Sequence, residues 1–345
     1  PFLQFLFQPN FSQSPLYLPN QQLGMTQAFF TINRLHDIMV KYGFDETAGN
    51  FQNSNFGLDG IANDYVLADA QDAGGINNAN FSTPPDGLRP RMQLYSFNRT
   101  NPMRDACLDN TVIIHEYMHG ISNRLTGGPN TTTCLMNAEQ TSEGWSDYLA
   151  LMLTTDWQVM QINNGTIPRA MGAYVSGSPM GIRTYPYSTD MLINPLTYGH
   201  LINTNGSVHK MGEIWCSALW DMTWKLIETE GINSNIENIS NGGGNVIALQ
   251  MVMLGMKLQP CQPGFLDARD AILKADSILF NGIHCCSIWN AFARRGMGVY
   301  ARQGSTNDYR DQEADFHDSP LGWNNIDWGI GIPTEGEVKI GRAHV

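Results

Sequence analysis

The chain has 345 residues with ordinary hydrophobicity, few charged side chains and a formal net charge of −12 at pH 7. This length supports a large core and more than one domain, while the acidic balance argues against a nucleic-acid partner. No apolar run approaches the roughly 20 residues that a membrane-spanning helix needs, so we expect no membrane partner either.

The first part of the chain combines one predicted helix with strands and loops. Apolar spacing predicts a helix over Met25–Tyr42, and Gly43 would end it. Residues 51–87 are rich in Asn, Asp and Gly around short apolar pieces, which is typical of strands and loops. Arg91–Phe97 alternates like a strand, and we expect it to act as an edge strand to which an extended peptide can pair.

After Asp105 the pattern is helical. Helical spacing, caps and glycine stops predict helices over residues 111–124, 142–154, 209–226, 265–275 and 287–295. A β-rich part followed by a helical part predicts an α+β fold with two lobes. We expect a β-rich N-terminal lobe over residues 1–107 and a helical lobe over 108–330. Residues 331–345 have no periodic pattern, and we expect a disordered or artefactual tail.

Cysteines and glycosylation signals leave several possibilities open. The six cysteines form no C-x-x-C pair, which argues against a cysteine zinc site, and their even number permits disulfides of unknown pairing. Seven N-x-[ST] sequons are present. They indicate either a secreted glycoprotein or chance in a chain rich in Asn, Ser and Thr. Pro1 is not an initiator and Phe2–Phe7 lacks a basic region, so we expect any secretion signal to lie upstream.

The segment Thr111–Gly120 reads TVIIHEYMHG and contains the motif H-E-x-x-H. Residues four apart share one face of a helix, so His115 and His119 can hold a single ion with Glu116 beside them. Two imidazoles suit Zn²⁺, which in catalytic sites takes a third protein ligand and a water. The alternative is a chance pair of histidines. The apolar run Val112–Ile114 argues against it, because a buried helix must supply partners for these polar groups.

The third ligand is predicted to be a carboxylate from the next helix. The metzincin spacing would require Gly and His where this chain has Ser122 and Leu125. Glu143 instead follows 24 residues after the second histidine, and Asp147 lies four residues further on. We expect Glu143 to bind the metal. Glu139 is the competing carboxylate, although it has no acidic partner four residues later.

Asp147 is expected to support the metal ligands rather than to bind the ion. A ligand histidine needs a partner for its second ring nitrogen, and we expect Asp147 to accept that N–H from His115. The alternative is an acidic first helical turn, which the helix dipole favours on any helix.

The motif and its surroundings resemble the fungalysin family of zinc metallopeptidases. The resemblance rests on HEYMHGISNRLTGGP and EGWSD, and extends to LHDIMVKYGFDETAGNFQ, GIRTYPYSTDMLINPLTY and LQPCQPGFLDARDAILKAD, covering roughly residues 29–300. It implies a thermolysin-like fold with the active site between two lobes and one catalytic Zn²⁺. It also implies a secreted endopeptidase that is made as a zymogen and acts on protein or peptide substrates. We expect the chain to be a monomer. Its own pro-region and the first strands of the mature enzyme would lie upstream.

This reading gives each candidate residue a role. Glu116 would act as general base toward a zinc-activated water. The resemblance implies a histidine that stabilises the oxyanion, and His209 in VHKMGEIW is the candidate, with His200 and Tyr198 as alternatives. No acid precedes His209 closely, so Glu213 is the candidate to orient it.

Two further sets of residues have less specific sequence signals. Arg183 lies among aromatic residues and is either a ligand for a substrate carbonyl or a packing residue. Asp64, Asp69 and Asp72 could hold Ca²⁺, but they lack the usual calcium-loop spacing, and solvated acids are the alternative.

Two other functions remain open on the same residues. One is a zinc-binding but catalytically silent interaction protein, against which Glu116 argues because such a protein needs no base. The other is a metallohydrolase that acts on a non-peptide bond.

Overall fold

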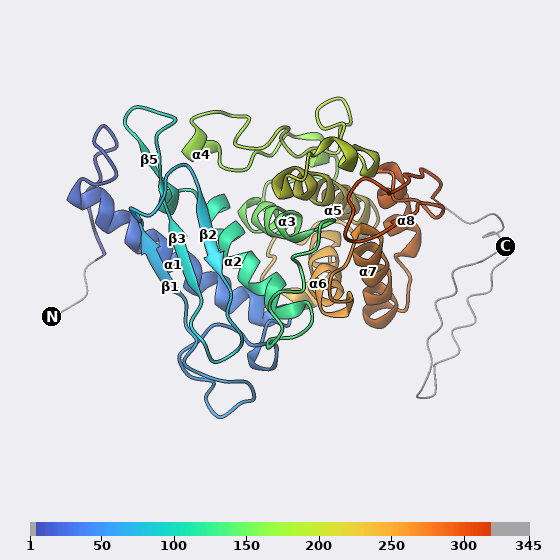
Figure 1. The fold of residues 1–345 in the computed structure, drawn as a ribbon, viewed down its shortest axis with the longest axis horizontal. Helices are drawn as coiled ribbons and strands as arrows, with labels where there is room; N and C mark the ends of the chain where they lie inside the picture. The colour runs from blue at the N-terminus through green and yellow to red at the C-terminus, as the bar shows by residue number, and fades with distance from the viewer. Residues whose placement is uncertain (1–4, 319–345) are drawn as a thin grey trace.

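The computed structural model describes residues 5–318, and the structural statements below concern that part of the chain. A small sheet lies toward one end of the molecule and a group of helices toward the other, with α2 between them (Figure 1). The fold is therefore α+β, as predicted. No helix in residues 5–318 is long and apolar enough to cross a membrane. The predicted tail over 331–345 lies outside the described residues.

The sheet has three short strands in the order β1 (Leu67–Ala70), β3 (Arg91–Leu94) and β2 (Ala79–Ser82). β1 runs parallel to β3, and β2 runs antiparallel to it. A second antiparallel pair joins β4 (Ser96–Phe97) to β5 (Arg104–Asp105). β3 is thus the middle strand, and β2 forms an edge of the sheet.

The prediction of a single edge strand over Arg91–Phe97 is wrong. The chain leaves the three-stranded sheet at Tyr95, and β4 pairs with a different partner. Both sides of β3 are already hydrogen-bonded to neighbouring strands, so it cannot accept an added peptide strand. Within β3, the side chains of Met92 and Leu94 are fully buried and that of Gln93 between them is not, which explains the alternating pattern.

Helices form most of the regular structure in the described residues. The longer ones are α1 (Leu18–Lys41), α2 (Asn110–Leu125), α3 (Ser142–Thr154), α5 (Val208–Glu230), α6 (Gly244–Leu258), α7 (Phe265–Phe280) and α8 (Cys285–Arg294). α4 (Ala173–Ser176) is a single turn, and η4 (Tyr198–Asn203) is a 3₁₀ helix. Among residues 5–107, α1 has 24 residues, which is more than the five short strands have together.

Side-chain caps explain where several helices begin. The Asp109 carboxylate accepts a hydrogen bond from the Thr111 backbone N–H at 3.1 Å and so caps α2. α1 begins seven residues earlier than predicted, because Pro19 is well suited to a first helical turn.

α6 was not predicted. Its residues are buried on nearly all faces, and such a helix has little apolar periodicity.

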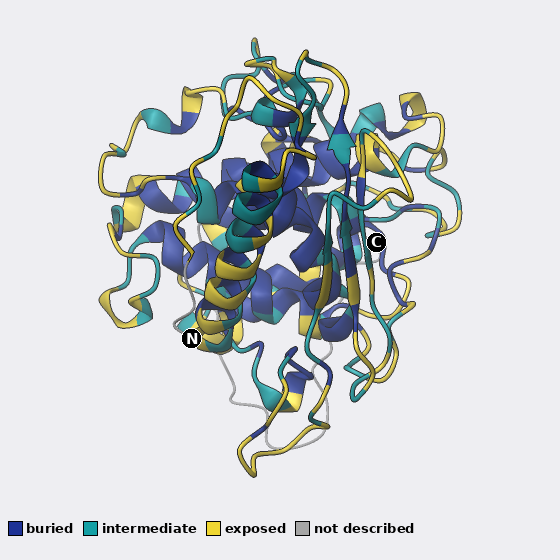
Figure 2. Ribbon diagram, turned by 90° about the vertical axis from the view of Figure 1, so that its left-hand side faces the viewer, coloured by how far each residue is buried: buried dark blue, intermediate teal, exposed yellow. Residues whose placement is uncertain are grey.

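The core includes buried residues of α2 and α3 and extends into the helical end of the molecule. Figure 2 shows buried residues on the central helices, while α1 exposes one side to solvent. Trp145 of α3 and Trp215 of α5 pack edge to face, with ring centres 4.9 Å apart, and both are fully buried. Large aromatic side chains of this kind contribute strongly to core stability.

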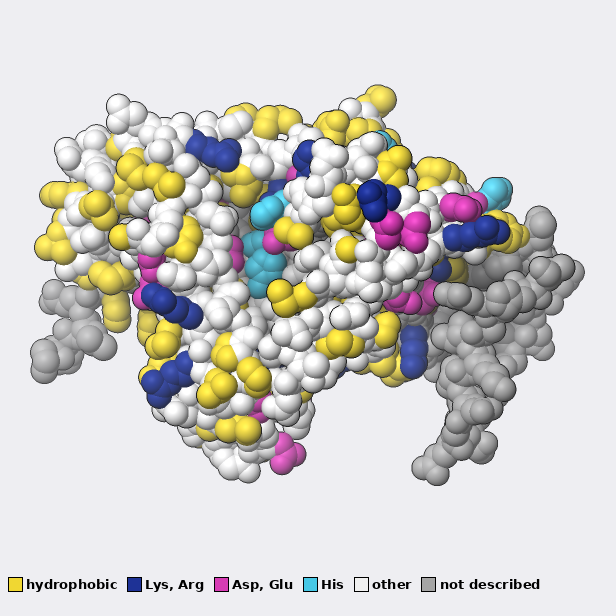
Figure 3. All heavy atoms as spheres, in the orientation of Figure 1, with side chains coloured by type: hydrophobic (Ala, Val, Ile, Leu, Met, Phe, Trp, Pro, Cys, Tyr) yellow, Lys and Arg dark blue, Asp and Glu magenta, His cyan; other side chains and the backbone are white. Residues whose placement is uncertain are grey.

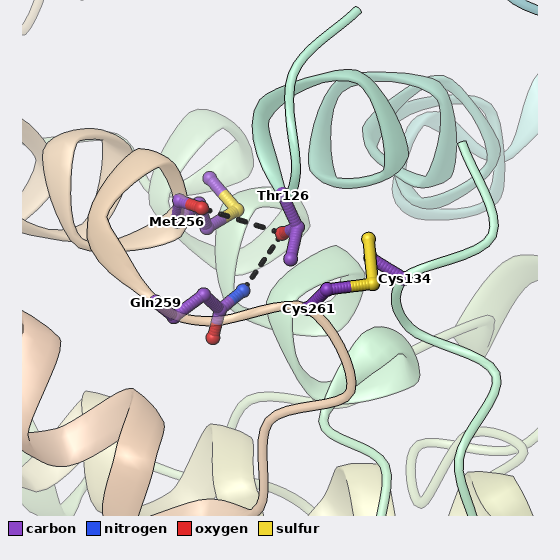
Figure 4. The surroundings of a disulfide bond; sticks show 5 residues. All are labelled: Thr126, Cys134, Met256, Gln259 and Cys261. Atoms are coloured by element: carbon purple, nitrogen blue, oxygen red, sulfur yellow. Dashed lines mark hydrogen bonds between the residues drawn. A yellow bond between two sulfur atoms is a disulfide. The ribbon is translucent and has the colours of Figure 1, made fainter. Parts of the chain in front are cut away.

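A disulfide joins Cys134, in the loop after α2, to Cys261, in the loop after α6 (Figure 4). Beside it, Thr126 accepts a hydrogen bond from the Gln259 amide at 2.8 Å and donates one to the Met256 carbonyl at 3.3 Å. The bridge closes a long segment, because its cysteines are 127 residues apart. It therefore restricts the unfolded chain strongly.

Candidate metal centre and active site

Three side chains from two packed helices converge on one point. His115 and His119 lie one turn apart on α2, and Glu143 lies in the first turn of α3. The His115 Nε2 atom lies 3.1 Å from His119 Nε2 and 3.2 Å from Glu143 Oε2, and His119 Nε2 lies 3.5 Å from Glu143 Oε1. Among the described residues, these form the group of His, Cys, Asp and Glu side chains that is arranged to hold a metal ion.

These distances fit a tetrahedral zinc site. Ligand bonds of 2.0–2.1 Å at tetrahedral angles separate the ligand atoms by about 3.3 Å. The Nδ1 atoms of the two histidines contact Asp147 and Ser142, which directs both Nε2 atoms toward each other. Two nitrogen lone pairs and a carboxylate at such short range repel one another unless a proton or a metal cation lies between them.

Asp147 is hydrogen-bonded to several side chains of the site. Its Oδ1 atom lies 2.7 Å from His115 Nδ1, and it also accepts hydrogen bonds from Arg183 at 2.7 and 2.8 Å and from the Tyr187 hydroxyl. Although burial opposes ionisation, Arg183 and His115 hold the pKa of Asp147 well below its ordinary value. The ionised carboxylate therefore orients His115 through its Nδ1–H. Although burial opposes protonation, the hydrogen bonds to Asp147 and Glu143 raise the pKa of His115 to about 10, so a metal bound at Nε2 would replace a proton there.

Glu116 lies next to the metal-binding group and lines the same cavity. Its side chain is buried, and this burial raises the pKa of its carboxyl to about 7. A carboxyl that titrates near neutrality can both accept and return a proton. Burial also lowers the pKa of His119 to about 4, so that ring is neutral at pH 7 and suited to bind a metal.

The cavity has a volume of about 570 Å³ and runs between the sheet and α5. On the sheet side it is lined by β2, including Ala79 and Phe81, and on the helical side by the start of α5. Figure 3 shows histidine side chains exposed in a hollow near the middle of the molecule. The metal-binding group thus lies at the bottom of an open cleft.

His209 faces the group from the first turn of α5. Its Nε2 atom lies 3.5 Å from Glu143 Oε2, and its side chain is 51% exposed in the cleft. Burial of the remainder lowers its pKa, which favours the neutral ring. Glu213 forms no hydrogen bond or ion pair with His209. It instead accepts hydrogen bonds from the Thr184 backbone and hydroxyl, so the predicted orienting contact is wrong.

The alternatives to His209 and Glu143 lie elsewhere. His200 accepts a hydrogen bond from the Thr197 backbone within η4 and does not line the cleft. Tyr198 is fully buried and donates to Glu139 at 2.9 Å. Glu139 also accepts from the Phe265 backbone at 3.1 Å, outside the metal-binding group.

The three acids that were considered as calcium ligands do not lie together at one site. Asp64 is fully buried and forms an ion pair with Arg124 at 3.0 Å. Asp69 and Asp72 both face Arg91, at 2.6 and 3.6 Å. Asp64 is therefore paired with Arg124, whereas Asp69 and Asp72 share Arg91, and the three acids do not form a common metal-binding group among the described residues.

Sequence reasoning missed two parts of the site. It did not identify β2 as the cleft wall, although the alternation of Ala79 and Phe81 in NNANFS could have indicated a strand there. It also missed the bonds that Arg183 and Tyr187 make to Asp147. These residues lie 36 and 40 positions away in the chain, and no local pattern predicts the contacts.

An α+β fold with two histidines on one helix and a glutamate on the next is typical of zinc metallopeptidases. The chain belongs to the fungalysin metallopeptidase family (M36), whose sequence model matches residues 3–301.

Several relatives match most of this chain. It is 45% identical over 290 residues to extracellular metalloproteinase 10 of Coccidioides posadasii, which covers 82% of this chain and 45% of the relative. It is 44% identical over 288 residues to extracellular metalloproteinase MEP of Pyricularia oryzae, covering 81% and 45%. It is 43% identical over 305 residues to extracellular metalloproteinase 1 of Trichophyton equinum, covering 87% and 48%. The chain thus spans about half the length of the curated relatives that it matches.

Proposed function

We propose that this chain is the catalytic part of a secreted zinc-dependent endopeptidase that cleaves protein or peptide substrates. The observation that carries the proposal is the position of Glu116 beside the His115, His119 and Glu143 donor atoms in one open cleft. Secretion is supported by the relatives, which are named extracellular metalloproteinases.

Each residue of the site takes a part in hydrolysis. His115, His119 and Glu143 would hold Zn²⁺, which when bound lowers the pKa of a water and polarises a carbonyl oxygen. Glu116 takes a proton from the attacking water and later delivers it to the leaving amine. Its near-neutral pKa in the buried cleft suits both transfers.

Arg183 has two uses in this mechanism. Its Nε and Nη2 atoms hold Asp147, whereas its Nη1 atom has no hydrogen bond to any described residue. Because Arg183 lines the cleft, we propose that Nη1 donates to a substrate backbone carbonyl. Asp147 in turn fixes the ring of His115 for metal binding.

His209 is proposed to stabilise the oxyanion that forms on the scissile carbonyl. Its imidazole lies at the cleft, close to a metal-ligating carboxylate oxygen, and its lowered pKa favours the neutral form with one N–H donor. A donor aimed at the position where charge develops lowers the barrier more than it strengthens substrate binding.

β2 is proposed to bind the substrate backbone. It is an edge strand with one side paired to β3, and it lines the cleft beside the metal-binding group. An extended peptide can add to such an edge through main-chain hydrogen bonds, which gives recognition with little dependence on sequence.

We also propose that residues 1–107 and 108–330 form the two lobes on either side of the cleft. The proposal is supported by the cleft lining, which takes β2 from the first segment and α2, α3 and α5 from the second. The zymogen form and its N-terminal pro-region remain inferences from the resemblance to the fungalysin family.

A protein digest tests the proposed function directly. We expect the chain to cleave casein at internal peptide bonds, to lose that activity with a zinc chelator and to regain it with added Zn²⁺. Zinc binding without cleavage would indicate a silent binding protein. Chelator-sensitive cleavage of esters but not of casein would indicate another metallohydrolase.

A further inference from the structure

Two exposed basic side chains line the cleft from different sides. Arg99 follows β4 on the sheet side, and Lys210 lies in the first turn of α5, next to His209. Both residues are exposed, and neither side chain forms an ion pair or hydrogen bond with any residue among 5–318. Their charges therefore face the space that a substrate would occupy.

The acids of the same cleft are placed differently. Glu116 and Glu213 are buried, and the side chain of Glu143 is only 12% exposed. Glu143 contacts both metal-site histidines and Arg183, while Glu213 accepts hydrogen bonds from Thr184. The acidic side chains thus lie buried in the floor of the cleft, and the exposed, unpaired charges on its walls are positive.

This arrangement contrasts with the charge of the chain as a whole, which has a formal net charge of −12. The overall field repels anionic peptides, so a basic cleft wall provides local attraction at the place where the peptide binds. A bound Zn²⁺ would add to this effect, because its charge would offset the nearby carboxylates.

We propose that Arg99 and Lys210 make the cleft selective for peptides with an acidic side chain close to the scissile bond. The inference rests on the proposed peptidase function and adds the substrate class. Single exposed ion pairs are weak, so each contact should change kcat/KM by about two- to fivefold at low ionic strength. Salt should reduce the preference, because both basic groups are solvent-exposed.

The test uses end-blocked peptides of one cleavable sequence, in which Gln is replaced by Glu at each of about three positions on either side of the cleaved bond. Gln and Glu have nearly the same shape, so the ratio of their kcat/KM values isolates the charge. For the wild-type chain we expect a ratio above about three for at least one position, falling toward one in about 0.5 M salt.

Charge-reversal variants assign the effect to residues. Arg99→Glu and Lys210→Glu should lower the Glu/Gln ratio to one or below. Lys274→Glu is the matched control, because Lys274 is an exposed cation on α7 that does not line the cleft. It should leave the ratio as in the wild type. The neutral variants Arg99→Gln and Lys210→Gln provide the same test with less disturbance.

Two outcomes would overturn the inference while leaving the peptidase function intact. One is a ratio near one at every position in the wild-type chain that cleaves the Gln peptides. The other is an equal loss of preference in Lys274→Glu, which would show that only the overall charge matters. Failure to cleave any Gln peptide, with zinc bound, would instead overturn the proposed function and this inference with it.

Discussion

At the scale of single residues, the chemistry depends on how Asp147 is surrounded. Four hydrogen bonds from three side chains end on this buried carboxylate, including one from a metal-site histidine. His115, a proposed metal ligand, is therefore held in one ring orientation, with its Nδ1–H directed at Asp147. Such pre-organisation reduces the free-energy cost of forming the site.

Asp147→Asn should weaken Zn²⁺ binding about 10- to 100-fold. The amide keeps the shape of the carboxylate but loses the negative charge that attracts Arg183. Its NH₂ group would also face an N–H donor of His115 or Arg183, and two donors cannot hydrogen-bond to each other. A competition titration against a chelating dye measures the change. Asp37→Asn, on a surface acid that also contacts a histidine, is the control. Unchanged affinity in Asp147→Asn would mean that the carboxylate does not support the metal.

His209→Phe should lower kcat about 10²- to 10³-fold and leave KM and zinc content nearly unchanged. The replacement keeps an aromatic ring but removes the donor that is needed mainly in the transition state. Steady-state kinetics on one peptide, with metal analysis of the same sample, provides the measurement. If His200→Phe produced this loss and His209→Phe did not, the assignment would move to His200.

At the scale of elements, the site depends on how closely α5 approaches α3. Gly144 and Gly212 face each other at their crossing. A Cβ atom on Gly212 would lie 2.4 Å from the Glu143 Cβ and 2.7 Å from the Gly144 backbone nitrogen. Only glycine permits this approach, which brings His209 of α5 close to Glu143 of α3.

Gly212→Ala should therefore destabilise the fold by about 1–3 kcal/mol and weaken zinc binding, because the helices must separate next to Glu143, a proposed metal ligand. Thermal unfolding and a zinc titration of the same variant measure both effects. Gly199→Ala is the control, since its Cβ atom would meet nothing closer than 3.6 Å. Equal behaviour of the two variants would contradict the close-packing account.

Glu139 joins three elements, because it lies before α3 and accepts hydrogen bonds from Tyr198 of η4 and Phe265 of α7. Burial raises the pKa of its carboxyl from 4.5 to about 8. The folded chain then keeps a proton that the unfolded chain releases, so the free energy of unfolding should fall as pH rises through this range.

Glu139→Gln should remove this component of the pH dependence. We expect its Tm to fall less than that of the wild-type chain between about pH 5 and pH 8.5, because the amide carries no proton to lose. Differential scanning calorimetry across that range compares the two proteins. Parallel Tm profiles would show that Glu139 does not titrate between these pH values.

At the scale of the whole molecule, the parts that could be predicted are those with a local pattern. H-E-x-x-H on a periodic helix, followed by the acidic start of the next helix, was sufficient to predict that His115, His119 and Glu143 lie together. The α+β class followed from the change of pattern after Asp105.

The rest depends on contacts between distant segments. The sequence of one strand does not determine which strands lie beside it in the sheet. For this reason β3 was predicted to be an edge strand, although it lies between β1 and β2. Arg183 and Tyr187 reach Asp147 from a loop with no regular period. α6 was missed because a helix that is buried on most sides lacks a polar face.

The central claim is that Glu116 acts as general base beside a zinc ion held by His115, His119 and Glu143. The most direct test compares the wild-type chain with Glu116→Gln for zinc content and peptide hydrolysis in the same preparation. We predict about one Zn²⁺ per chain in both proteins and a fall in kcat of at least about 10²-fold in the variant, because an amide cannot accept the proton. A fully zinc-loaded Glu116→Gln chain with near wild-type turnover would contradict the account.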